Sequence, residues 1–211
     1  MSHAHAPDLA HHFESYEQQK ETSFLGMWLF LSQEVMFFSG LFVTYVIYRM
    51  SYPDAFLAGS LKLPTTVGFV NTLVLLISSF TMVYAVHSAQ HNNNKGVFRG
   101  LVGTIVFGTA FLGVKVVEYA DKWEHHLVPG LNWDWDGPAG GIIFYSLYFV
   151  MTGMHALHMI VGIGILFFML RPALRGRWHE NNYNFVEGFG LYWHFVDIVW
   201  IFLFPFLYLI R

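Results

Sequence analysis

Ionisable side chains occur inside long apolar stretches of this sequence, where a charged group is costly. They are Glu34, Lys115, Glu118, His155, His158, His194 and Asp197. Carboxylates and imidazoles together can bind haem, iron or copper, and they also form proton relays in membrane proteins. These residue types therefore permit a carboxylate–histidine metal site, but hydrogen bonds between packed helices would use the same residues.

The apolar stretch WLFLSQEVMFFSGLFVTYVIY, residues 28–48, contains one acid, Glu34. On a helix that begins at Phe24, this residue lies about 15 Å from the start. Because a low dielectric disfavours a charged carboxylate, we expect Glu34 to be protonated or paired. Its depth favours a role in a proton relay or in contact with a lipid headgroup. The alternative is a neutral acid that is hydrogen-bonded to a neighbouring helix.

Lys115 and Glu118 in GVKVVEYADK are three residues apart and so share one helix face. They lie near the end of their apolar stretch, where the lysine stem can carry its ammonium group toward the membrane surface. The spacing favours a structural ion pair over a catalytic role.

His155 and His158 in TGMHALHMIVG have the same spacing. Metal ligation is one interpretation, and helix packing through the neighbouring small residues is the one we favour. His194 and Asp197 in LYWHFVDIVWIF repeat the pattern, and there the aspartate could orient either a metal-bound or a structural histidine.

The composition predicts an all-α, polytopic membrane protein with a five-transmembrane-helix bundle. Of the 211 residues 55% are hydrophobic and 12% are charged, whereas a soluble domain carries about 25% charged residues. The absence of cysteine excludes disulfides, thiolate ligands and iron–sulfur clusters. A formal charge of −3 gives no indication of nucleic-acid binding.

We divide the chain into a polar tail, residues 1–23, and one transmembrane domain, residues 24–211. The predicted spans are about 24–48, 67–89, 97–119, 141–170 and 189–210. The tail carries His3, His5, His11 and His12 and is interpreted as a disordered polar segment, with a metal-binding tract as the alternative. The segments on the N-terminal side of the predicted spans contain more Lys and Arg than those on the other side. This excess predicts that the N-terminus lies in the cytoplasm and the C-terminus outside.

Four segments in this order, SQEVMFFSG, GVKVVEY, TGMHALHMIVG and GLYWHFVDIVWIF, resemble subunit III of the haem–copper terminal oxidases, in the short five-helix bacterial form. The resemblance implies a subunit of the bacterial inner membrane that carries no haem or copper itself. Such a subunit packs on catalytic subunit I, holds phospholipid and sustains proton uptake and turnover. Glu34 matches the buried carboxylate of that family, close to bound lipid, and Arg171 matches a basic residue that meets a lipid headgroup.

The other partners expected from the resemblance are subunit II, a small additional subunit and a respiratory supercomplex, with haem and copper in partner subunits. The short form lacks two helices that form one wall of a lipid cleft in the long form. A cytochrome c oxidase is the favoured complex. The alternatives are a quinol oxidase, a nitric oxide reductase accessory protein and, from another class, a stand-alone histidine-ligated metalloprotein.

Overall fold

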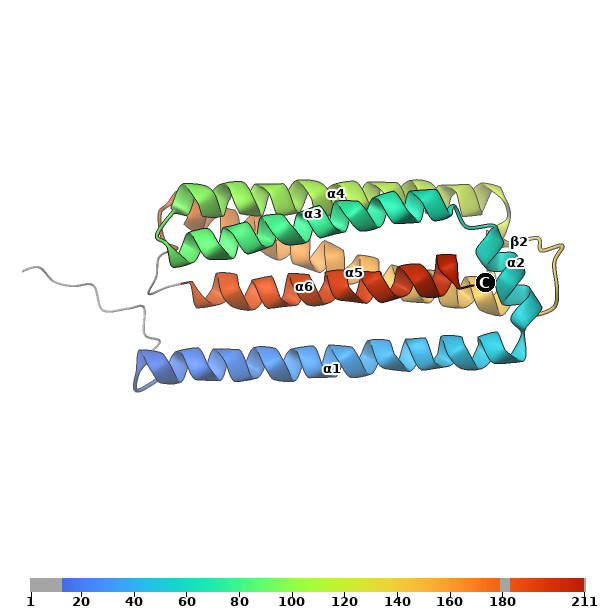
Figure 1. Ribbon diagram of the computed structural model, residues 1–211, viewed down its shortest axis with the longest axis horizontal. Coiled ribbons are helices and arrows are strands. Elements are labelled where there is room, and N and C mark those ends of the chain that lie inside the picture. The colour runs from blue at the N-terminus through green and yellow to red at the C-terminus, as the bar shows by residue number, and fades with distance from the viewer. Residues whose placement is uncertain (1–12, 179–182, 211) are drawn as a thin grey trace, which may run out of the picture.

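Six α-helices and one short β-hairpin make up the described part of this computed structural model, residues 13–178 and 183–210 (Figure 1). The helices are α1 (Tyr16–Ser51), α2 (Pro53–Leu61), α3 (Thr65–Gln90), α4 (Asn94–Glu124), α5 (Gly141–Leu174) and α6 (Asn184–Phe204), with a π-helical turn, η1 (Pro205–Leu209), after α6. Between α4 and α5 the antiparallel strands β1 (Leu127–Val128) and β2 (Asn132–Trp133) pair with each other.

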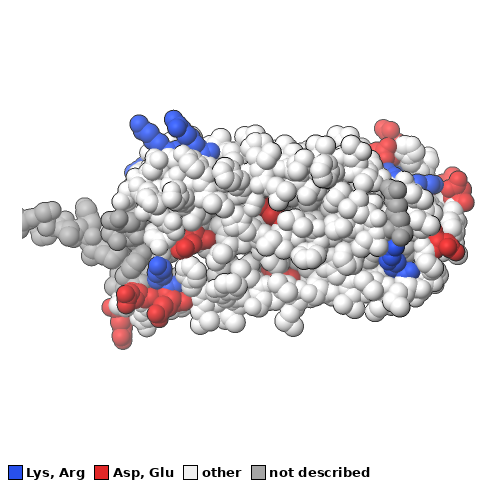
Figure 2. All heavy atoms as spheres, in the orientation of Figure 1, with Lys and Arg blue, Asp and Glu red and all other residues white. Residues whose placement is uncertain are grey.

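Five of these helices are long and apolar enough to cross a membrane, and the predicted all-α polytopic architecture is confirmed. They run side by side, and Figure 2 shows Lys, Arg, Asp and Glu gathered at the two ends of the bundle, with mostly uncharged atoms between. An apolar belt between two charged ends is the surface that a bilayer requires. The chain is therefore a multi-pass membrane protein.

Helix α1 begins at Tyr16, so it includes residues that we placed in the polar tail. The hydroxyl of Ser15 accepts a hydrogen bond from the backbone N–H of Gln18 at 3.2 Å, and Glu17 lies in the first turn. A side-chain cap and an acid at the N-terminus both favour helix formation there. The tail histidines His3, His5, His11 and His12 lie outside the described residues.

Helix α2 falls between the first two predicted spans, about 24–48 and 67–89, where no helix was predicted. It begins at Pro53, which suits a first helical position because its missing N–H needs no partner there. Phe56 and Gly59 pack on Phe144 of α5, where a Cβ atom at Gly59 would collide with the ring. Helix α2 thus lies across the hairpin end of the bundle (Figure 1).

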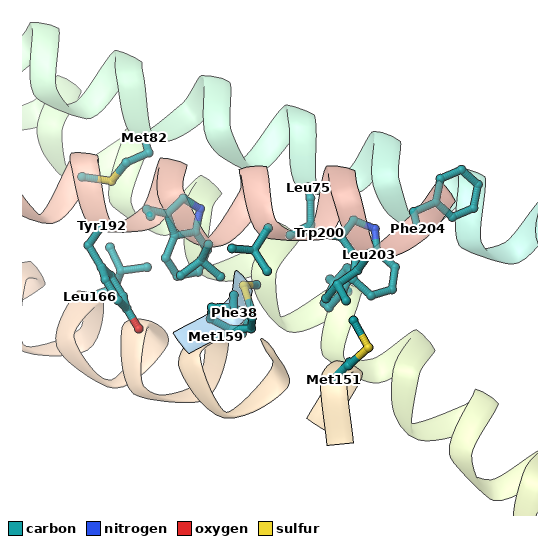
Figure 3. Close-up of a cluster of buried hydrophobic side chains, with 14 of the residues drawn as sticks. Phe38, Leu75, Met82, Met151, Met159, Leu166, Tyr192, Trp200, Leu203 and Phe204 are labelled. Atoms are coloured by element: carbon teal, nitrogen blue, oxygen red, sulfur yellow. The ribbon is translucent and has the colours of Figure 1, made fainter. Parts of the chain in front are cut away.

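The core is centred on α6, which packs against α3 and α5. Trp193 and Trp200 are buried there, and Figure 3 shows Trp200 among Leu75, Leu203 and Met151. The indole N–H of Trp193 donates to Ser78 Oγ at 3.2 Å, and that of Trp200 donates to Thr72 Oγ1 at 3.0 Å. Because lipid is as apolar as these side chains, packing and interhelical hydrogen bonds hold such a bundle together.

Helix α1 lies apart from the α3–α4 pair and packs mainly against α5 and α6 (Figure 1). Many of its large apolar side chains are exposed, including Trp28, Met36 and Met50. This looser placement leaves a hollow between α1, α5 and α6.

Candidate functional site: a groove beside a buried carboxylate

The hollow between α1, α5 and α6, called here the α1 groove, has a volume of about 730 Å³. Its walls are largely apolar, and polar side chains lie at the end where α1 begins. Its lining residues are Gln19, Ser23, Met27, Phe30, Glu34, Leu157, His158, Val161, Ile165, Asn184, Phe185, Gly188, Phe189 and Tyr192.

Glu34 and His158 meet at the inner end of the α1 groove. His158 Nε2 lies 3.1 Å from Glu34 Oε2, and His158 Nδ1 lies 2.8 Å from the Met154 carbonyl oxygen. A carbonyl can only accept, so Nδ1 carries a proton. The bond between Nε2 and Oε2 then holds one proton, either as neutral acid and imidazole or as carboxylate and imidazolium. In both forms the pair has no net charge, which suits its depth in the membrane.

Contacts from α1, α5 and α6 position His158: Phe38 and the Met154 carbonyl contact its ring, and Tyr192 contacts its backbone. Phe38 packs on this ring with ring centroids 5.3 Å apart. The hydroxyl of Tyr192 donates to the His158 carbonyl oxygen at 2.9 Å. In Figure 3 the Tyr192 hydroxyl points toward the helix that carries Met159, which is α5. The imidazole is therefore oriented toward Glu34 by contacts from three helices.

Lys115 and Glu118 form an ion pair at 3.1 Å inside the bundle, with side chains 4% and 2% exposed. Lys115 Nζ donates to the hydroxyls of Tyr208 at 3.0 Å and Tyr148 at 3.3 Å. Both hydroxyls also donate to Glu118 Oε1. The expectation that Lys115 reaches the membrane surface is wrong, because these two tyrosines supply its partners in the interior.

His155 and His158 do not act together. His155 is 1% exposed, its ring packs against Phe111 and Trp200, and neither ring nitrogen has a hydrogen-bond partner among the described residues. His158 faces Glu34 on α1 instead. Side chains three residues apart on a helix point in somewhat different directions, so these two reach different neighbouring helices.

His194 and Asp197 both lie next to Ser79 of α3. His194 Nδ1 lies 2.7 Å from Ser79 Oγ. Asp197 is buried, and the Ser79 side chain is its polar neighbour, although no hydrogen bond of good geometry to its carboxyl oxygens is found within the part of the chain that the structure describes. In residues 13–178 and 183–210, no group of three or more His, Asp or Glu side chains is arranged to hold a metal ion.

Arg171 lies in the last turn of α5 and is exposed, at the same end of the bundle as the start of α1. It does not line the α1 groove. The structure thus places Glu34 and His158 in one site and Arg171 outside it.

Lys122 is a buried cation that lies beyond the predicted third span, about 97–119. It is 3% exposed, and its Nζ donates to the Lys62 carbonyl oxygen at 3.1 Å and to Asp121 Oδ2 at 2.7 Å. Helix α4 continues to Glu124 and so keeps Lys122 on the stripe of Lys115 and Glu118. The spacing of three and then four residues could have revealed this stripe.

The chain is similar to subunit III of known oxidases over most of its length. Residues 11–210 match the family model described as cytochrome c oxidase subunit III. The cytochrome c oxidase subunit 3 of Alkalihalophilus pseudofirmus is 33% identical over 95% of this chain and 93% of its own length. The quinol oxidase subunit 3 of Bacillus spizizenii is 32% identical over 92% and 91%. A heme–copper oxidase subunit I+III of Aeropyrum pernix is 31% identical over 97% of this chain and 25% of the relative.

Proposed function

This chain belongs to the cytochrome c oxidase subunit III family and is a subunit III of a haem–copper oxidase, and we propose that its complex is a cytochrome c oxidase. In that complex it serves as a non-catalytic subunit that packs on the catalytic subunit, binds phospholipid and sustains proton uptake during turnover. Haem and copper belong to the partner subunits. The observation that carries the proposal is the α1 groove with Glu34 and His158 at its inner end.

Two features support assembly with the catalytic subunit. The relative from Aeropyrum pernix bears the name subunit I+III, which joins a subunit I to a subunit III in one protein. Helix α1 also exposes large apolar side chains that a neighbouring protein can cover, Trp28 and Met36 among them. Subunit II, a small additional subunit and a respiratory supercomplex belong to the same proposal.

The dimensions of the α1 groove suit a phospholipid. From Gln19 to Glu34 the helical rise gives about 22 Å. One leaflet of the hydrocarbon core is about 15 Å thick, so the groove is long enough for the acyl chains and for a headgroup beyond them. Gln19 and Ser23 would lie at headgroup level. Arg171, which lies outside the groove, would meet the headgroup of another lipid at the same membrane surface. The acyl chains would lie along Met27, Phe30 and Ile165.

The proposed orientation places the N-terminus in the cytoplasm and the C-terminus outside. By the order of the spans in the sequence, six basic residues fall on the N-terminal side of the membrane and four on the other, and cytoplasmic loops are the richer in Lys and Arg. The first group is Lys20, Lys95, Arg99, Arg171, Arg175 and Arg177, and the second is Arg49, Lys62, Lys122 and Arg211. The α1 groove then opens at the cytoplasmic side, where an oxidase takes up its protons.

We assign Glu34 a role in proton supply through the proton that it shares with His158. Because the pair has no net charge, its shared proton can move between the carboxyl group and the imidazole without burying a net charge. Lys115, Glu118, His155, His194 and Asp197 have a structural role in this proposal, because their contacts lie inside the bundle.

A quinol oxidase is the second candidate, because the relative from Bacillus spizizenii with that name is as similar as the cytochrome c oxidase relatives. The purified complex decides between them by its electron donor. We expect oxygen consumption with reduced cytochrome c and none with a quinol alone. Oxygen consumption with quinol and none with cytochrome c would assign the chain to the second class.

The lipid function is tested by filling the α1 groove. A Cβ atom at Gly188 would meet Met27 Cε at 3.5 Å, so Gly188→Leu fits the backbone and projects into the groove. We expect this variant complex to lose bound phospholipid and to inactivate faster during turnover. Gly26→Leu is the control, because Gly26 has no atom within 4 Å of its Cβ position and lies outside the groove. Unchanged lipid content in Gly188→Leu would contradict the proposal.

A further inference from the structure

A second hollow lies at the hairpin end of the bundle, away from the α1 groove. An apolar groove of about 750 Å³ follows the surface of α4 beside the start of α3. A polar compartment of about 500 Å³ adjoins it under the hairpin. The two hollows share Lys62, Asp121 and Lys122, so they form one continuous site with an apolar part and a polar part.

The apolar part exists because small side chains line α4. Ala110 and Gly113 lie in its floor, and Val114 and Val117 form its wall. No atom lies within 4 Å of a Cβ position at Gly113. From Ala110 to Lys122 the helical rise gives about 18 Å, which is close to the thickness of one leaflet, about 15 Å. This part can take an acyl chain along its length.

The polar part carries charges of both signs. Lys62 Nζ lies 3.1 Å from Asp136 Oδ1, with side chains 44% and 89% exposed. Asp121 and Asp134 line the same compartment. Lys122 is committed to Asp121 and to the Lys62 carbonyl oxygen. Lys62 is paired with the exposed Asp136 and lies over the Trp135 ring at 4.6 Å, but it is exposed enough to turn toward a ligand. His125 also lines the compartment, with its Nδ1 3.3 Å from Asp121 Oδ1. The compartment therefore offers one accessible lysine and one histidine beside three carboxylates.

We propose that this site binds a zwitterionic phospholipid whose headgroup ends in a primary ammonium, phosphatidylethanolamine. Its phosphate would accept hydrogen bonds from Lys62, and its ammonium would donate to the carboxylates of Asp121 and Asp134. A phosphatidylcholine headgroup has no N–H to donate, so it leaves these acceptors unmatched. An anionic phosphatidylglycerol brings a further negative charge to the three acids. The charge pattern thus favours the ethanolamine headgroup.

The test uses the whole purified oxidase complex that contains this chain. The complex is stripped of lipid with detergent, incubated with vesicle lipids that mix phosphatidylethanolamine, phosphatidylcholine and phosphatidylglycerol, and washed. The lipid that remains bound is extracted and counted by mass spectrometry. Gly113→Leu fills the apolar groove without a steric collision, and Gly164→Leu is the matched control, because its Cβ position is equally open but lies outside the site.

We expect Gly113→Leu to hold one phosphatidylethanolamine fewer per complex than the wild type, and Gly164→Leu to hold the wild-type number. Asp134→Asn is expected to keep a lipid in this site but to lose the preference for the ethanolamine headgroup over choline. The proposal is overturned if Gly113→Leu retains the wild-type count, or if wild type takes up phosphatidylcholine equally well. Gly188→Leu, which fills the α1 groove, leaves this lipid in place, so failure of one lipid site is distinguished from failure of the other.

Discussion

The imidazole of His158 and the carboxyl group of Glu34 lie 3.1 Å apart although 124 residues separate them in the chain. They connect α5 to α1, the long helix with the loosest packing. The same pair forms the inner end of the α1 groove. One hydrogen bond therefore serves both to fix α1 on the bundle and to place a proton beside the groove.

Substitution of Glu34 separates the hydrogen bond from the ionisable group. Glu34→Gln keeps an oxygen and an N–H that can pair with His158, so we expect the complex to assemble with wild-type thermal stability. Glu34→Leu leaves His158 Nε2 without a partner and lowers stability by about 1–2 kcal/mol. A hydrophobic carbodiimide, which reacts with a buried carboxyl group, is expected to label Glu34 in the wild type and to label neither variant. Persistent labelling at another residue, or equal stability of the two variants, would contradict this role.

The Lys115–Glu118 pair is sensitive to the loss of one partner. Lys115→Met leaves a carboxylate buried with two tyrosine hydroxyls and without a cation, and breaking a buried pair in this way costs about 3–5 kcal/mol. Thermal inactivation of the purified complex measures the effect. Lys95→Met is the control, because Lys95 is exposed at the start of α4. A Lys115→Met complex as stable as the control would show that the pair contributes nothing.

His155 is expected to tolerate replacement by an aromatic residue. Its ring nitrogens have no partner among the described residues, and Phe111 and Trp200 flank the ring. A buried polar group without a partner can be replaced by an apolar group of similar shape at little cost. We predict that His155→Phe changes stability by less than about 1 kcal/mol, whereas His158→Phe is clearly destabilising. Thermal unfolding of both complexes tests this difference, and the reverse order would refute it.

The ion pair between Lys62 and Asp136 makes the hairpin sensitive to acid. The hydrogen bond from Lys62 lowers the pKa of Asp136 below its usual value. A depressed folded-state pKa stabilises the folded form above the unfolded pKa of about 4, and this contribution is lost as pH falls below that value. Amide hydrogen exchange in residues 125–140 should be slower in wild type than in Asp136→Asn at pH 6. Below the folded-state pKa of Asp136 the two proteins should exchange alike, and a difference that stays constant as the pH falls from 6 through that range would exclude this origin.

Local patterns in the sequence predicted part of this site. Apolar runs of about 20 residues predicted the five crossing helices, because length and composition fix that property without tertiary contacts. The spacing of Lys115 and Glu118 predicted their ion pair, since both residues lie on one helix. The depth of Glu34 predicted that it would be protonated or paired.

The partners of these residues could not be predicted, because they depend on contacts between distant segments. His158 reaches Glu34, and Tyr148 and Tyr208 hold Lys115, only once the helices have packed. The same packing turns His155 and His158 to different neighbours. Helix α2 was also missed, because its main support is Phe144 of α5, far from it in sequence.

The central claim is that this chain serves a haem–copper oxidase and carries no redox centre. The most direct test is to purify the chain from its native membrane under mild conditions, separate the subunits and measure iron and copper in each. We predict that the chain co-purifies with subunits that contain haem and copper and that the separated chain holds neither metal. A folded chain that purifies alone with stoichiometric iron or copper would contradict the account.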